Sequence, residues 1–167
     1  MMVQVRVLGI ALDAARQHIV LLKPLLEEED VEAQRVLPIW IGAQEATSIL
    51  IAISGEHAPR PLSHDLMKTL LDTLQAEVSR VEVTRIEEGT FYAELTLTTP
   101  LGTRVIDARP SDAVALAVRA AAPLFIDDQL LDEAGIPAEV ADPHTEEVEV
   151  DEFKKFLDDV DPEDFQG

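Results

Sequence analysis

The sequence has no cysteine and few aromatic residues, and each shortage narrows what the protein can be. Without cysteine the chain forms no disulfide bond and offers no thiolate ligand to a metal. A metal ion would have to bind to carboxylates and histidine, which favours hard ions such as magnesium, manganese or calcium. Because only 4% of the residues are aromatic, alanine, leucine, valine and isoleucine must fill most of the core.

Basic residues are also scarce, with 13 lysines and arginines against 33 acidic residues and a net charge of −20. The acidity is concentrated at the end, where residues 127–167 hold 16 acidic residues against two lysines. This balance argues against a broad basic face for nucleic acid, because neutralising phosphates needs positive charge. It still allows a small positive pocket or a contact bridged by a metal ion.

Long hydrophobic runs are missing as well, since charge or glycine interrupts every apolar stretch before it reaches the length of a membrane span. The first residues lack the cationic start and apolar stretch of a secretory signal. We therefore expect a cytoplasmic protein that makes no membrane contact. Sequence signatures of kinases, zinc proteases, serine hydrolases and dinucleotide-binding enzymes are absent too.

Hydrophobic periodicity predicts an α+β fold, in which a mostly antiparallel sheet packs with two or three helices. We expect residues 1–136 to form this domain and residues 137–167 to form an acidic, partly mobile extension. Alternation of apolar and polar residues predicts strands at 3–10, 18–22, 35–41, 78–86, 91–98, 104–107 and 123–126. Helical spacing predicts helices at 43–54, about 63–75, 110–121 and 128–134. On the second helix we expect Leu66, Leu70, Leu71 and Leu74 to face inward.

Two polar clusters that each open a helix are the strongest site candidates. Their sequences are Arg60-Pro61-Leu62-Ser63-His64-Asp65-Leu66 and Asp107-Ala108-Arg109-Pro110-Ser111-Asp112-Ala113. Helix-capping preferences explain the proline, serine and aspartate, but they explain neither arginine nor the histidine. If the two helix starts meet in space, they form a pocket that contains two guanidiniums, three carboxylates and one imidazole.

Four segments, taken together, resemble the bifunctional nuclease domain family. They are Leu37-Pro38-Ile39-Trp40-Ile41-Gly42 with Glu45-Ala46 after it, Gly89-Thr90-Phe91-Tyr92-Ala93, and the two polar clusters. The resemblance covers roughly residues 1–135. It implies a compact α+β domain that self-associates as a homodimer or other homo-oligomer, with metal-assisted nuclease activity on DNA and RNA. The site residues carried over with the matching motifs are Glu45, Arg60, His64, Asp65, Asp107, Arg109, Ser111 and Asp112.

Phosphodiester hydrolysis gives each of these residues an expected role. A divalent ion (Mg²⁺ or Mn²⁺) held by carboxylates can activate water and stabilise charge at the phosphate. We expect that the ion binds Asp65, Asp107 and Asp112, with Glu45 as a further ligand. Arginine binds phosphate through paired hydrogen bonds, so Arg60, Arg109 and Ser111 are expected to bind the substrate. His64 is expected to transfer a proton near neutral pH.

A structural explanation exists for the same residues and stays open at this point. Carboxylates in the first turn stabilise a helix through its dipole, which accounts for Glu45, Asp65 and Asp112. The arginines then pair with these carboxylates. The rival function is a regulatory module that binds a small anion or a protein through the same pocket, without catalysis. The triplet Glu152-Phe153-Lys154 matches part of a common nuclease signature, but we expect it to be a chance match in the acidic extension.

Overall fold

The computed structural model describes residues 1–26 and 34–141, which form one mostly antiparallel sheet with helices packed against it. The α+β prediction is confirmed. Glu152-Phe153-Lys154 and nearly all of the predicted acidic extension lie outside the described residues. No helix in the described ranges is long and apolar enough to cross a membrane.

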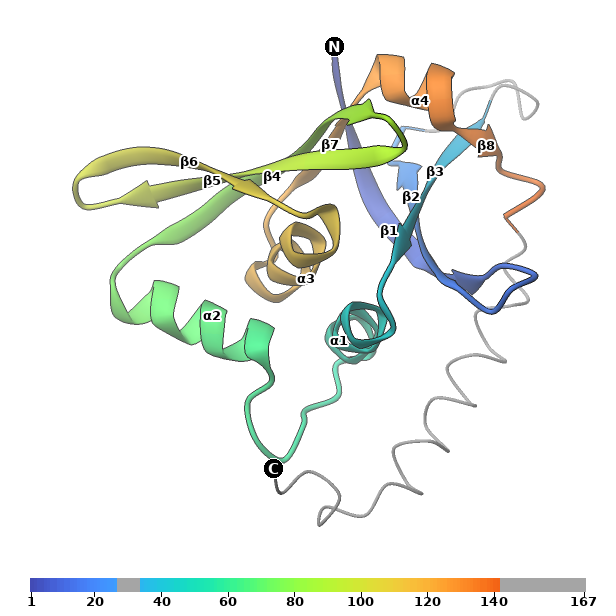
Figure 1. The fold of residues 1–167 in the computed structure, drawn as a ribbon. Helices are drawn as coiled ribbons and strands as arrows, with labels where there is room; N and C mark the ends of the chain where they lie inside the picture. The colour runs from blue at the N-terminus through green and yellow to red at the C-terminus, as the bar shows by residue number, and fades with distance from the viewer. Residues whose placement is uncertain (27–33, 142–167) are drawn as a thin grey trace.

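The sheet has eight strands within the described residues, in the order β6-β5-β4-β7-β1-β2-β3-β8 (Figure 1). All neighbours pair antiparallel except β4 and β7, which pair parallel. The strands are β1 (Met2–Leu12), β2 (His18–Pro24), β3 (Arg35–Ile41), β4 (Glu77–Glu87), β5 (Thr90–Thr99), β6 (Gly102–Ala108), β7 (Leu124–Asp127) and β8 (Ile136–Pro137).

The β4–β5–β6 meander follows the alternation seen in the sequence. Val81 and Val83 of β4 and Ala93 and Leu95 of β5 are buried on the face that carries the main core. Glu88 and Gly89 connect β4 to β5, and both have positive φ angles, of 50° and 78°. Such φ values are those of the two central residues in a tight hairpin turn, so the predicted turn is confirmed.

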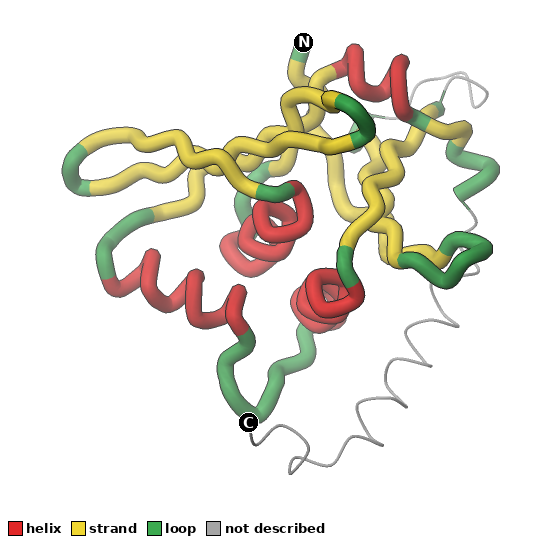
Figure 2. Tube along the Cα trace, in the orientation of Figure 1, coloured by secondary structure: helices red, strands yellow, loops and turns green. Residues whose placement is uncertain are grey.

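The helices α1 (Ala43–Ser54), α2 (Ser63–Thr73) and α3 (Pro110–Ala120) pack together on one side of the β4–β5–β6 sheet, and α4 (Asp128–Ala134) follows β7 (Figures 1 and 2). Helix α3 is central: it contacts α1, α2, β4 and β5. Its residues 113–117 are all buried, as an alanine-rich, apolar helix requires. Because alanine side chains are short, α1 and α2 can approach the α3 backbone closely enough for polar side chains to bridge them.

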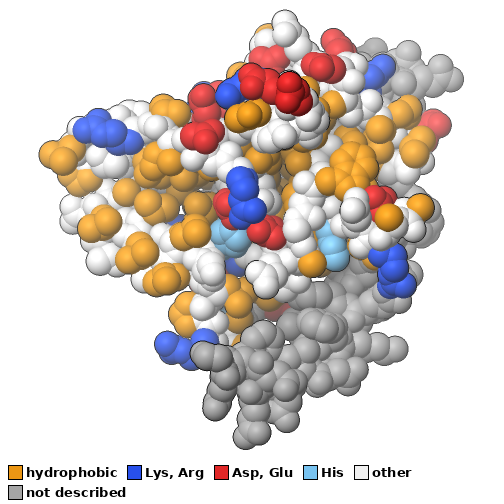
Figure 3. Space-filling model, in the orientation of Figure 1, with side chains coloured by type: hydrophobic (Ala, Val, Ile, Leu, Met, Phe, Trp, Pro, Cys, Tyr) orange, Lys and Arg blue, Asp and Glu red, His pale blue; other side chains and the backbone are white. Residues whose placement is uncertain are grey.

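The prediction for the inner face of α2 is wrong for three of its four leucines. Leu66, Leu70 and Leu74 are 52%, 52% and 71% exposed, and only Leu71 packs against the core. Hydrophobic side chains accordingly gather on the surface over α2 and the β5–β6 hairpin in Figure 3. The residue that α2 buries is His64, so a polar contact as well as the packing of Leu71 holds this helix against its neighbours.

Candidate functional site

The two polar clusters meet in space, as a shared site requires. His64 lies in the first turn of α2 and Asp112 in the first turn of α3. The Nε2 atom of His64 and Oδ1 of Asp112 are 2.8 Å apart, a hydrogen bond between residues 48 positions apart in the chain. The contact holds the beginning of α2 against the beginning of α3.

The second ring nitrogen of His64 faces α1, where Ser48 Oγ lies 2.6 Å from Nδ1. The same hydroxyl oxygen accepts a hydrogen bond from Arg119 Nη2 at 3.0 Å, so the serine proton is directed to Nδ1. We assign Nδ1 as the acceptor of this proton and Nε2–H as the donor to Asp112. The His64 ring is thus oriented from both sides and is only 6% exposed.

Arg109, the residue just before α3, extends the contacts outward to α1. Its Nε donates to Asp112 Oδ2 at 2.9 Å, and its Nη2 donates to Glu45 Oε1 at 3.0 Å. Both carboxylates raise the pKa of Arg109. Its side chain is nevertheless 66% exposed, so the guanidinium is fixed in place and still open to solvent. Glu45 reaches it by lying close over Gly42, where a side-chain Cβ would clash with Glu45 Oε2.

Arg119, in the last turn of α3, closes the inner end of the contacts. Its Nε donates to Asp65 Oδ1 at 2.7 Å, while Nη2 also reaches the backbone carbonyl of Ser48. The other oxygen of Asp65 accepts the backbone N–H of Leu62 and so caps α2. We call these seven linked side chains the interhelix network: Glu45, Ser48, His64, Asp65, Arg109, Asp112 and Arg119.

The network keeps its two aspartates ionised. Burial raises the pKa of Asp112, but hydrogen bonds from Arg109 and His64 outweigh this effect and hold the pKa below its ordinary value of 3.8. Burial likewise opposes ionisation of Asp65, and the hydrogen bonds from Arg119 and the Leu62 backbone again lower its pKa overall. Both residues therefore act at neutral pH as hydrogen-bond acceptors that carry charge.

Three of the residues predicted from sequence lie outside this network. Arg60 is exposed in the loop before α2. Asp107 is exposed on β6, opposite Glu94 of β5, and so does not join Asp112. Ser111 is buried in the first turn of α3, next to Asp112. The three aspartates that were expected to share one metal site are therefore separated: Asp65 and Asp112 belong to the network and Asp107 does not.

Two members of the network were not predicted. Ser48 and Arg119 carry no recognisable motif, and their connection depends on how three helices pack. A signal was present for Arg119, because it is a charged residue in a helix that is otherwise nearly apolar. Its side chain is 8% exposed, and a buried arginine requires acceptors, which Asp65, Ser48 and Ala115 provide.

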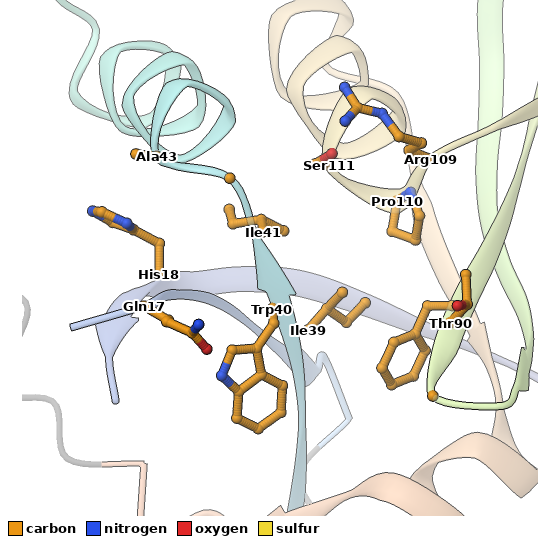
Figure 4. A pocket seen from close by; sticks show the side chains of 13 residues that line it. Gln17, His18, Ile39, Trp40, Ile41, Ala43, Thr90, Arg109, Pro110 and Ser111 are labelled. Carbon is orange, nitrogen blue, oxygen red and sulfur yellow. The ribbon is translucent and has the colours of Figure 1, made fainter. Parts of the chain in front are cut away.

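A pocket of about 610 Å³ opens beside the exposed end of the network (Figure 4). It lies between the end of β3, the β4–β5 turn and the beginnings of α1 and α3. Trp40 and Phe91 contribute aromatic surface, and Arg109 is the only lysine or arginine in the lining. The residues that line it are Gln17, His18, Ile39, Trp40, Ile41, Gly42, Ala43, Gly89, Thr90, Phe91, Arg109, Pro110 and Ser111.

Metal ligation has limited support in the described part of the chain, where no group of three or more histidines and carboxylates is placed to hold an ion. Glu45 and Asp112 come nearest, since both accept hydrogen bonds from the same Arg109 guanidinium. Two carboxylates suit magnesium, which takes one or two protein carboxylates and completes its shell with water and substrate phosphate. All three network carboxylates already accept hydrogen bonds from an arginine, Glu45 and Asp112 from Arg109 and Asp65 from Arg119, so an ion would share them with these side chains. Asp107 lies apart from them on β6.

Comparison with known proteins identifies a family for this chain. The model of the bifunctional nuclease domain matches residues 25–139. An uncharacterized protein of Mycobacterium tuberculosis is 39% identical, with 98% of each chain aligned.

Named plant relatives are more distant. Bifunctional nuclease 2 of Oryza sativa subsp. japonica is 30% identical over 62% of this chain and 33% of its own length. Bifunctional nuclease 2 of Arabidopsis thaliana is 29% identical over 57% of this chain and 30% of its own length. The aligned part is thus only about a third of these plant proteins. The match to more than half of the chain, in the region that holds the network, shows that this protein belongs to the bifunctional nuclease domain family.

Proposed function

We propose that the protein is a nuclease that hydrolyses phosphodiester bonds in DNA and RNA. The observation that carries the proposal is the exposed Arg109 guanidinium, held by Glu45 and Asp112 where α1 and α3 begin, at the edge of an open pocket. Arginine fixed in this way binds a phosphate oxygen without further ordering of its side chain. Family membership and the names of the plant relatives support the same chemistry.

Each residue of the exposed end then has a distinct task. Arg109 has more N–H donors than its two carboxylate contacts use, and the remaining donors bind the phosphate. Asp112 is ionised and orients the attacking water by accepting a hydrogen bond from it. His64 has both nitrogens engaged and is buried, so we propose that it positions Asp112 instead of contacting the substrate. This task replaces the direct proton transfer expected from the sequence.

A divalent metal ion is part of the proposal, with Glu45 and Asp112 as its protein ligands. The donor set fits because both groups are hard oxygen ligands and both are partly exposed, at 19% and 26%. Bound Mg²⁺ or Mn²⁺ would neutralise charge at the phosphate. Arg109 would then bind the substrate while its carboxylate partners bind the ion.

Cleavage of labelled single-stranded RNA and DNA, with Mg²⁺, Mn²⁺ or a chelator, tests the proposal. We compare the wild type with Asp112→Asn and with Asp72→Asn, an exposed aspartate of α2 that pairs only with Lys68 among the described residues. Metal-dependent cleavage that falls at least about a hundredfold in Asp112→Asn alone supports the site. Absence of cleavage, or equal cleavage by all three folded proteins, refutes it.

The rival candidate is a non-catalytic module that binds an anion or a protein through the same pocket. It is favoured by the net charge of −20, since a general nuclease gains from a basic groove. The two functions differ in one result: the module binds inorganic phosphate or oligonucleotide at Arg109 and leaves the oligonucleotide intact with every metal tested.

Self-association and location complete the proposal. We propose that the protein forms a homodimer or other homo-oligomer, on the basis of the family resemblance, and that it is located in the cytoplasm. Sedimentation equilibrium of the full chain measures the mass of the assembly directly, and a mass that stays at 18.4 kDa over the accessible concentrations rejects self-association.

A further inference from the structure

Trp40, the only tryptophan of the chain, is held as an exposed platform at the end of β3. Its side chain is 53% exposed, although most large apolar side chains of β3 are buried. The indole Nε1 donates to Asp13 Oδ2 at 3.0 Å, and the other oxygen of Asp13 accepts the backbone N–H groups of Ala15 and Gln17. The turn at Asp13 therefore fixes the orientation of the indole ring and leaves the ring accessible to solvent.

The pocket beside this platform is lined differently from the rest of the chain, and the carboxylates of Glu45 and Asp112 pair with its one arginine. About one residue in five is acidic, yet none of the thirteen lining residues is Asp or Glu, and Arg109 is the only lysine or arginine among them. Helices α1 and α3 both begin at the pocket, at Gly42 and Arg109, and neither helix has a side-chain cap. Helix N-termini favour anions because their first N–H groups lack partners.

A second feature at the α3 terminus also points to a ligand. Ser111 lines the pocket and is only 6% exposed, and within the described residues its hydroxyl has no hydrogen-bond partner. The fully enclosed side-chain atoms without a partner in the described residues are Arg80 Nε and Thr84 Oγ1, so the Ser111 hydroxyl is open to the pocket and available to donate to a bound group. In Figure 4, Ser111 and Arg109 lie together above the part of the pocket that contains Ile39 and Trp40.

We propose that this pocket binds one unpaired nucleotide of a single strand, with the base stacked on Trp40 and its phosphate on Ser111 and Arg109. The inference rests on the proposed function and specifies its substrate as single-stranded nucleic acid. Bases within a duplex are stacked on their neighbours, so only an unpaired base can lie against an aromatic side chain. The pocket volume is in the range of small-ligand sites, about 300–1,000 Å³, which suits one nucleotide rather than a helix.

Binding measured in the presence of a chelator tests the inference without relying on cleavage. The probe is a fluorescein-labelled oligothymidylate, either free or paired with its complement, followed by anisotropy. Quenching of Trp40 emission is a second readout, because every indole signal of the chain comes from this pocket. The variants are Trp40→Ala, Trp40→Phe and, as a matched control, Leu101→Ala, an 84% exposed apolar residue at the β5–β6 turn.

We expect the single strand to quench Trp40 and to bind at least about tenfold more tightly than the duplex. Trp40→Ala is expected to weaken binding by about five- to 150-fold, which corresponds to the roughly 1–3 kcal/mol of one base–aromatic stack. Trp40→Phe retains part of the affinity because it keeps an aromatic face, and Leu101→Ala binds like the wild type.

Equal affinity for single strand and duplex, absence of quenching, or wild-type binding by Trp40→Ala overturns the inference. So does a lower sedimentation mass of Trp40→Ala, since the indole would then contact a second copy of the chain. These results are separable from the proposed function. Binding through Trp40 without cleavage under any metal refutes the nuclease alone, whereas metal-dependent cleavage that is unchanged in Trp40→Ala refutes only the pocket assignment.

Discussion

Replacement of Arg119 by methionine tests whether the interhelix network stabilises the fold. Methionine keeps most of the apolar stem and removes the guanidinium, which joins α3 to Asp65 of α2 and to Ser48 of α1. The largest loss is the charged hydrogen bond to Asp65, since charge-assisted bonds contribute about 1.5–3 kcal/mol. The full cost of breaking a buried ion pair, about 3–5 kcal/mol, does not apply because Asp65 is 36% exposed and regains water.

Including the lost contacts to Ser48, we expect the free energy of unfolding to fall by about 2–4 kcal/mol. With a slope near 2 kcal/mol per molar urea, the midpoint of urea unfolding shifts down by about 1–2 M. Lys68→Met is the matched control, because Lys68 pairs with Asp72 on the surface of α2. Such i,i+4 pairs contribute only about 0.3–0.5 kcal/mol. Equal midpoints for the two variants would refute the claim that Arg119 links the helices.

Three further predictions concern the same network. The pKa values of Asp65 and Asp112 are lowered in the folded protein, so the stability that their ionised forms contribute is complete above pH 3.8 and is lost as the pH falls below that value. Midpoints of urea unfolding measured against pH reveal this loss, and the loss is smaller in Asp112→Asn. Ser48→Ala leaves His64 Nδ1 without its donor and lowers the free energy of unfolding by about 1–2 kcal/mol. Imidazole ¹⁵N chemical shifts of the wild type report the tautomer of His64, and shifts that differ from the Nε2–H pattern contradict our assignment. Gly42→Ala displaces Glu45 from Arg109, so cleavage slows while the circular dichroism spectrum is retained; an unchanged rate would exclude a role for Glu45.

Much of the fold was predictable because its elements depend on local patterns. The strands of the β4–β5–β6 meander alternate cleanly, and Glu88-Gly89 is a strong turn signal. The apolar character of α3 likewise predicted that it would be central. The leucines of α2 were misjudged because helical spacing shows which residues share a face, but not whether another layer covers that face.

The site was predictable only in part, for a related reason. The two helix-opening motifs predicted that His64 and Asp112 belong to one site, and in the structure His64 Nε2 lies 2.8 Å from Asp112 Oδ1. The sequence did not separate Asp107 from Asp112, because the direction of the β6 side chains depends on the register with β5. Ser48 and Arg119 join the network through packing between helices, which no short motif records. The pocket is likewise formed by segments far apart in the chain, so the role of Trp40 emerged only from the fold.

The most direct test of the account is the rate of oligonucleotide cleavage by Arg109→Ala beside Arg104→Ala. Arg104 is an exposed arginine of β6 whose guanidinium reaches only the carbonyl of Thr103 among the described residues. If Arg109 binds the phosphate that is hydrolysed, its loss lowers the metal-dependent rate at least about a hundredfold and Arg104→Ala retains the wild-type rate. Equal rates for the two variants and the wild type would contradict the assignment of this site.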